Sequence, residues 1–119
     1  MYDSFRFFFN QNRQFCEVYF WDVHPDTFDN WKAGRWAYFV ATYENPRKGK
    51  FGEIHFVKKR FRHDTVAHEL DHLRCAWMFS KWILVTPKNE EWFCKFGDEL
   101  HRKFWREYGK HQKRIGDAK

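Results

Sequence analysis

The sequence has no long hydrophobic run and few cysteines. Its first residues hold a short apolar stretch that Arg6 interrupts, without the small-residue cleavage site of a signal peptide, so we expect neither a secretory leader nor a membrane span. Cys16, Cys75 and Cys94 are odd in number, far apart and outside any Cys-x-x-Cys pair. This usage argues against a disulfide framework and is typical of reduced thiols, so we expect a cytoplasmic protein.

Branched aliphatic residues are also scarce. Leu, Ile and Val together number 13 in 119 residues, whereas Phe, Trp and Tyr number 27. A chain of this length forms one domain and buries only a modest share of its surface. Aromatic rings bury the largest apolar area per residue, so we expect them to form most of the core.

The first half of the chain predicts a small antiparallel sheet. Residues 16–23 and 35–43 are rich in β-branched and aromatic residues and are predicted as strands, and a turn signal over 44–50 precedes a third strand at 51–57. A short helix is expected over residues 3–12, with Phe5, Phe8 and Phe9 on one side. Because short connections favour antiparallel neighbours, the strands predict a three-stranded antiparallel sheet.

The second half has helical periodicity. Apolar residues recur at spacings of four, three and four after the predicted N-cap Asp64, which predicts a helix to about residue 80. Asn89 is predicted to cap a second helix that ends at Gly109. The expected buried stripes are Val66, Leu70, Leu73 and Trp77 on the first helix and Phe93, Gly97, Leu100 and Phe104 on the second. Strands followed by helices indicate an α+β domain over residues 1–109, with a basic, flexible tail over 110–119.

Residues 68–72 read His-Glu-x-x-His within the first predicted helix. His68 and His72 are one turn apart, so both rings project from one face, away from the apolar stripe, and can share one zinc ion. Glu69 neighbours the first ligand, where it can accept a proton from zinc-activated water. Chance would produce about 0.03 such matches in a chain of this composition. The motif therefore predicts a zinc site with Glu69 as its general base.

A catalytic zinc normally takes a third protein ligand, which we expect downstream. Glu91 lies in the first turn of the second helix, with 18 residues between it and His72, where a carboxylate can reach a neighbouring helix. The adjacent Glu90 fits the apolar stripe of that helix better, and Cys75 and His101 are further candidates. If Cys75 and Glu91 both bound, the site would be closed and structural.

These two motifs resemble the gluzincin branch of the zinc metallopeptidases, in which His-Glu-x-x-His is followed by a glutamate on the next helix. They are also similar to minimal zincin-like proteins of phages and prophages, which pair a VAHELDH-like helix with an EEWFC-like one. The resemblance covers residues 51–108. It implies that His68, His72 and Glu91 bind zinc, that Glu69 is the general base, and that the strand at 51–57 is the sheet edge along which an extended peptide lies. The amine-binding motif of the aminopeptidases proper is not found.

Five further residues are weaker candidates for this site. His63 is placed to contact a substrate, His101 and Tyr108 to donate to a developing oxyanion, and Asp71 or Asp98 to orient an imidazole bound to zinc. Residues of these types are more often ordinary helix-surface or hydrogen-bonded groups, and that reading stays open for each of them.

We therefore expect a monomeric zinc metallopeptidase that hydrolyses peptide bonds in a peptide or protein substrate and does not contact membranes. The net charge of +6, with basic clusters at 58–62 and 110–119, favours a second hypothesis. In it the zinc only stabilises the fold, and the basic segments contact nucleic acid or a protein partner. A third hypothesis is that the motif is an accident on a core helix and binds no metal.

Overall fold

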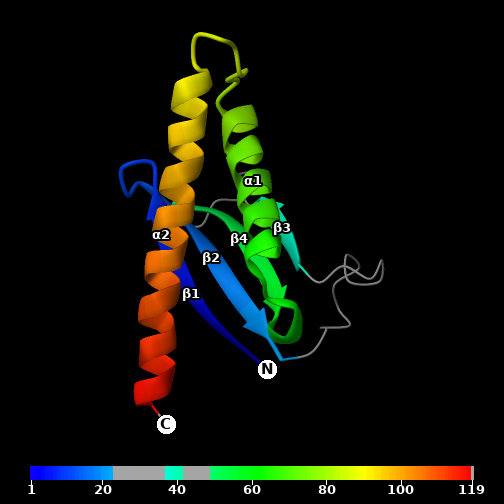
Figure 1. The fold of residues 1–119 in the computed structure, drawn as a ribbon, viewed down its shortest axis with the longest axis vertical. Coiled ribbons are helices and arrows are strands. Elements are labelled where there is room, and N and C mark those ends of the chain that lie inside the picture. The colour runs from blue at the N-terminus through cyan, green and yellow to red at the C-terminus, as the bar shows by residue number, and fades with distance from the viewer. Residues whose placement is uncertain (23–36, 42–48, 119) are drawn as a thin grey trace.

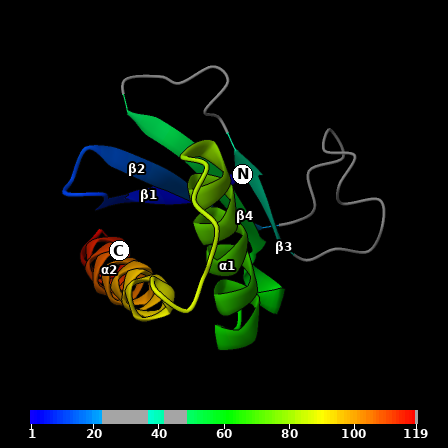
Figure 2. The same cartoon turned by 90° about the horizontal axis from the view of Figure 1, so that it is seen from above.

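The computed structural model describes residues 1–22, 37–41 and 49–118, and its fold is α+β, as predicted. Four strands precede two helices, which lie on one face of the sheet (Figures 1 and 2). The elements are β1 (Tyr2–Phe9), β2 (Gln14–Trp21), β3 (Ala37–Ala41), β4 (Lys50–Val57), a short 3-10 turn η2 (Lys58–Arg60), α1 (His63–Ser80) and α2 (Glu90–Asp117). In the described part of the chain, no helix combines the length and the apolar composition that crossing a membrane requires.

The sheet is mixed, with the strand order β1-β2-β4-β3. The pairs β1/β2 and β3/β4 are antiparallel, but β2 and β4 are parallel, so the prediction of an entirely antiparallel sheet is wrong. The reason is the long connection between β2 and β3, which allows the chain to cross over rather than fold back beside β2. Strand 51–57, expected at the edge, is therefore the interior strand β4, and β1 and β3 are the edges of the described sheet.

The segment predicted as a helix over residues 3–12 is the edge strand β1 and the turn that follows it. Phe5, Phe7 and Phe9 are buried, whereas Phe8 points outward, which is the two-residue alternation of a strand. The chain then reverses through residues 10–12, all of which have positive φ angles near 60°. Asparagine tolerates this left-handed backbone, so the two asparagines in the turn favour a β1-β2 hairpin over a continuing helix.

Aromatic rings fill the space between the sheet and the helices, as the composition predicted. Phe104 of α2 is fully buried and lies with its ring centroid 5.5 Å from Phe5 and 5.9 Å from Phe7 of β1. Phe96 of α2 packs against Trp77 of α1 at 5.0 Å. These contacts hold both helices against the same sheet face, and each buried ring contributes about 1.5–3 kcal/mol of hydrophobic stabilisation.

Both predicted helices form, and their apolar stripes are mostly as expected. The four apolar residues predicted on α1 are buried, as are Gly97, Leu100 and Phe104 on α2. The N-cap of α1 is Arg62 rather than Asp64, whereas Asn89 is the N-cap of α2 as predicted. The predicted helix end at Gly109 is wrong, because α2 continues to Asp117.

The last two turns of α2 belong to the folded domain. His111 is 6% exposed and its Nε2 lies 2.7 Å from Oδ1 of Asp3 on β1. Lys58 contacts the other carboxylate oxygen of Asp3 at 2.8 Å. Burial would raise the pKa of Asp3, but the hydrogen bonds from His111 and Lys58 outweigh it and lower that pKa. Helix α2 and its contacts with β1 therefore extend beyond residue 109.

Candidate metal centre

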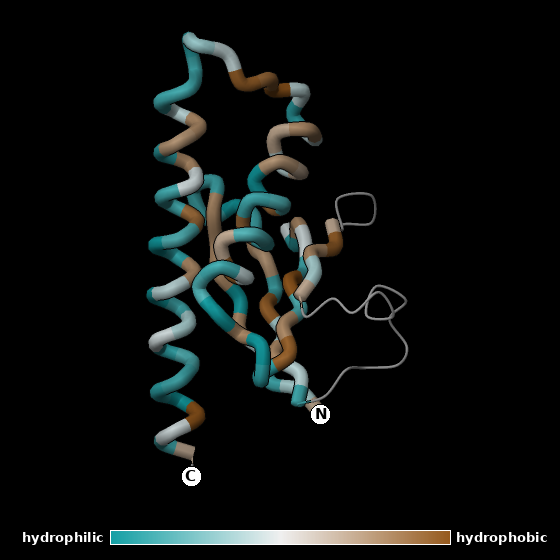
Figure 3. The backbone as a smooth tube through the Cα atoms, turned by 45° about the vertical axis from the view of Figure 1, so that its right-hand side comes forward, coloured by the Kyte–Doolittle hydropathy of each residue, from teal (hydrophilic) through white to brown (hydrophobic). Residues whose placement is uncertain are grey.

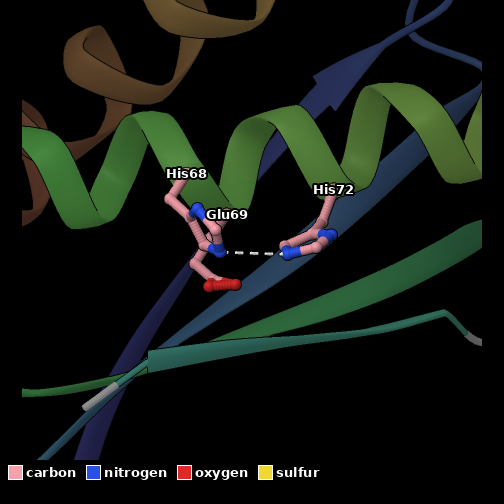
Figure 4. Close-up of side chains that lie close together, drawn as sticks. All are labelled: His68, Glu69 and His72. Atoms are coloured by element: carbon pink, nitrogen blue, oxygen red, sulfur yellow. Dashed lines mark hydrogen bonds between the residues drawn. The ribbon is translucent and has the colours of Figure 1, made fainter. Parts of the chain in front are cut away.

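The two histidines of the motif meet on α1. Nε2 of His72 lies 3.1 Å from Nε2 of His68, and the ring centroids are 4.6 Å apart with the planes nearly perpendicular (Figure 4). Two nitrogens bound at about 2.0–2.1 Å to one tetrahedral zinc ion lie about 3.3 Å apart. The helix therefore already holds these two nitrogens, which share a hydrogen bond, at a separation that fits a shared metal ion.

Glu69 completes a compact group with these histidines. One ligand atom from each of the three residues lies within 4.8 Å of the others. His68 and His72 are exposed, but Glu69 is only 2% exposed. Each residue advances about 100° around a helix, so Glu69 lies between the histidine face and the buried side chains of Val66 and Leu73. Solvent thus reaches the two imidazoles, while the carboxylate is held beneath them.

The group projects towards the β3 side of α1 (Figure 4). β3 is one of the two edge strands of the described sheet and pairs only with β4 among the described strands. Side chains alternate along a strand, and Ala37 and Phe39 of β3 pack against the main core under α1. The candidate centre therefore lies beside a sheet edge rather than in the space between the helices.

Glu91, the predicted third ligand, is not part of this group. It is exposed in the first turn of α2, next to Trp92, whose ring packs against Trp77 near the end of α1. The side of α1 that faces α2 is marked by Arg74, whose Nη1 donates to the Phe93 carbonyl at 3.3 Å. His68 and His72 lie about 120–160° around the helix from Arg74. Binding of Glu91 to the same ion would therefore require α2 to be repositioned.

The alternative third ligands do not join the group either. Glu90 is exposed in the first turn of α2, and His101 is half-buried further along the same helix. Cys75 is exposed on the histidine side of α1, but its sulfur is not among the clustered ligand atoms. Within the described residues, the gathered donor set consists of the two imidazoles and the Glu69 carboxylate.

The other candidates have their own contacts. Asp71 accepts a hydrogen bond from Arg74 at 2.8 Å, and the ring of His63 lies 4.4 Å from that of Trp105. Asp98 is exposed on α2. Tyr108 packs against Phe20, Phe61 and Phe104, and burial raises the pKa of its hydroxyl. None of these side chains joins the His68, Glu69 and His72 group. His24 lies outside the described residues.

A second polar cluster, on the sheet face opposite the helices, was not predicted. His55 of β4 is 2% exposed and its ring stacks between Tyr19 and Tyr38, with both centroids at 4.7 Å. Its Nδ1 accepts from the Trp21 indole at 3.0 Å, and its Nε2 lies 3.0 Å from Glu53. The sequence signal was the i, i+2 spacing of Glu53 and His55, which places both on one face of a strand.

Electrostatics in this cluster stabilise an ionised carboxylate. The hydrogen bond from His55, followed by the ion pair with Lys50, lowers the pKa of Glu53 to about 2. Burial raises the pKa of the Tyr38 hydroxyl. These groups are tied to one another and to strands on both sides of β4, so we interpret the cluster as structural.

The predicted basic segments are distributed over two surfaces. In the 58–62 cluster, Lys58 bridges Asp3 and Asp22 at 2.8 Å each, and Arg62 pairs with Asp64. After Gly109, Lys110, Lys113 and Arg114 lie on the continuation of α2, and Arg114 lines a groove beside β1. Comparison of the chain with family models, with curated proteins and with solved structures finds no match.

Proposed function

We propose that the protein is a metal-dependent hydrolase that cleaves peptide bonds at the His68, Glu69 and His72 group. The observation that supports this most is the 3.1 Å separation of the two Nε2 atoms beside a buried carboxylate. Neutral imidazoles are donors that a zinc ion prefers in hydrolytic sites, and a carboxylate beside the ion can accept a proton from water. In a structural zinc site all four positions would be filled by protein ligands, and only this smaller set is gathered in the described chain.

The roles of the three residues follow from their positions. His68 and His72 would hold the ion, because their nitrogens are solvent-facing and convergent. A zinc ion, when bound, supplies Lewis-acid activation of water and of a peptide carbonyl. Glu69 accepts the proton of the attacking water and returns it to the leaving amine, acting as a general base and then as a general acid. Its burial keeps the carboxylate close to the reacting groups and away from competing water.

An extended peptide is the proposed substrate, and β3 is the strand that would bind it. Peptides commonly add to an exposed sheet edge through main-chain hydrogen bonds, and β3 is the edge nearest the histidine side of α1. A substrate strand along β3 would run beneath the two imidazoles. The resemblance of the motif to the gluzincins supports the same substrate class.

We further propose that the protein acts as a monomer in the cytoplasm. Its three cysteines are free, and Cys75 and Cys94 are exposed, which suits a reducing compartment. Burial raises the pKa of the Cys16 thiol well above its usual range, so this cysteine is an inert part of the core.

Digestion of a peptide library by the zinc-loaded protein tests the proposal. Glu69→Gln should keep zinc but lower the rate of cleavage about 10²–10⁴-fold, because it removes the proton acceptor. Glu91→Gln is the matched control, since it makes the same chemical change at an exposed glutamate outside the group. Chelation of the wild-type protein should abolish cleavage.

The controls also separate the alternatives. We expect Glu91→Gln to retain both zinc and activity, whereas a third-ligand role for Glu91 predicts loss of both. Cleavage by Glu69→Gln at the wild-type rate would remove Glu69 from the mechanism. If the wild-type protein binds zinc stoichiometrically but cuts no peptide in the library, the peptidase proposal is wrong.

A further inference from the structure

A polar groove of about 750 Å³ lies between α2 and β1, at the sheet edge opposite β3. It is lined by four cations and two acids, which are Arg6, Lys103, Arg106 and Arg114 against Glu17 and Glu107. The groove is therefore net positive. The groove lies on the far edge of the sheet from the candidate metal centre. It is therefore a separate surface.

The cations of the groove belong to a longer basic stripe on α2. Lys103, Arg106, Lys110 and Arg114 follow one another at spacings of three, four and four, which places them on one side of the helix. Glu107 is shared between Arg106 at 3.7 Å and Lys110 at 3.2 Å, so one acid faces two cations. Arg114 has no ion-pair partner among the described residues. Lys110 and Arg114 belong to this stripe because α2 continues beyond Gly109, and Figure 3 shows that most of α2 is hydrophilic.

Aromatic rings line the strand next to these cations. Alternation along β1 directs Tyr2, Arg6 and Phe8 to the sheet face that the helices do not cover. Tyr2 is 49% exposed and Phe8 is 38% exposed, and Phe8 rests on Phe15 at 5.5 Å. The guanidinium of Arg6 lies 4.2 Å above the Phe15 ring while half of its side chain remains exposed. Phe8 and Arg6 thus offer flat, supported surfaces inside the groove.

We propose that this groove binds single-stranded nucleic acid. The phosphates would contact Lys103, Arg106 and Arg114, and a base would stack on Phe8. A positive groove beside exposed rings is the arrangement by which proteins bind single strands without reading their sequence. A duplex hides the faces of its bases, and an acidic peptide has no group that requires the rings. Neither ligand would therefore use both the cations and the exposed rings of this groove.

Fluorescence anisotropy with the full-length protein and a fluorescein-labelled mixed-sequence 20-mer of single-stranded DNA tests the proposal. The double variant Arg106→Glu and Arg114→Glu should weaken binding at least tenfold. It should also reduce the slope of log affinity against log salt by about 1.4, because about 0.7 is expected for each lost phosphate contact on a single strand. Lys81→Glu with Lys88→Glu is the control, since it makes the same charge change on the exposed α1-α2 connection. The control should weaken binding less than threefold, and equal losses in the two double variants would overturn the assignment.

The aromatic half of the groove has its own test. Phe8→Leu keeps an apolar side chain but removes the ring, and it should weaken binding to the single strand at least fivefold, since each stacked base contributes substantially. A duplex of the same sequence, or polyglutamate as a competitor, should bind at least tenfold more weakly than the single strand. Unchanged binding by Phe8→Leu, or equal binding of the duplex or of polyglutamate, would overturn the proposal. Zinc content should be the same in every variant, which separates this surface from the metal centre.

Discussion

Glu53→Gln should destabilise the fold at neutral pH, and the effect should shrink in acid. In the folded protein, hydrogen bonding from His55 and the ion pair with Lys50 lower the pKa of Glu53 from an ordinary 4.5 to about 2. A group with a lowered folded pKa contributes stability above its unfolded pKa, and this stability is lost as the pH falls towards the folded pKa. The contribution is therefore complete above about pH 5.5 and decreases from there towards pH 2.

The expected magnitude follows from the difference between the two pKa values. About 2.5 pH units correspond to ~3.4 kcal/mol if the interaction were fully shielded from water. The Glu53 side chain is 24% exposed, so solvent screening reduces the contribution to about 1–2 kcal/mol. Linkage predicts that less than half of this, about 40%, remains at pH 3.

Urea unfolding of the wild type and of Glu53→Gln at pH 7, 5 and 3 measures the effect. Glu17→Gln is the matched control, because Glu17 pairs with the half-exposed Arg6 on the same sheet face. Its effect should stay below about 0.5 kcal/mol. A difference between wild type and Glu53→Gln that is absent at pH 7, or that does not change between pH 7 and pH 3, would refute the reasoning.

Two other perturbations test how α2 is attached to the sheet. Asp3→Asn removes the charge that holds His111, so it should lower the free energy of unfolding by about 1–2 kcal/mol at pH 7. It should also speed amide exchange in the last turns of α2. Unchanged exchange there would contradict this attachment of the helix to β1. Gly109→Ala should stabilise the protein by about 0.5–1 kcal/mol, since its Cβ would meet open space in a continuous helix. Gly97→Ala should be less stable than Gly109→Ala, because its Cβ would displace the Arg74 guanidinium from the Phe93 carbonyl and Asp71, and equal thermal melting temperatures would argue against this packing.

The helices could be predicted because their signals are local. The 3.6-residue periodicity of α1 located Val66, Leu70 and Trp77 in the core, and one helical turn between His68 and His72 was enough to bring their rings together. The expectation that a glycine ends the helix failed at residue 109, because it takes no account of tertiary contacts. The buried contact of His111 with β1 continues the helix beyond that point.

The sheet was harder to predict because its arrangement depends on residues far apart in the chain. The alternation of Phe5, Phe7 and Phe9 was readable as a strand, but Phe5, Phe8 and Phe9 also fit one face of a helix. The parallel pairing of β2 with β4 has no local signal, since it depends on where the chain goes after β2.

The position of Glu91 was hard to predict for the same reason, because it depends on how two separate helices pack. A glutamate at the right spacing predicts contact only if the two helices turn the correct sides towards each other. Here Arg74, rather than His68 or His72, faces α2, so sequence spacing alone did not bring Glu91 to the histidines.

Anomalous diffraction at the zinc edge, from crystals of the wild-type protein grown with zinc, tests the central claim most directly. We expect one strong peak about 2.0–2.1 Å from Nε2 of His68 and Nε2 of His72, with the Glu69 carboxylate beside it. If no peak lies at these nitrogens, and the two rings keep their hydrogen bond while zinc binds elsewhere, the metal centre and the activity proposed for it are contradicted.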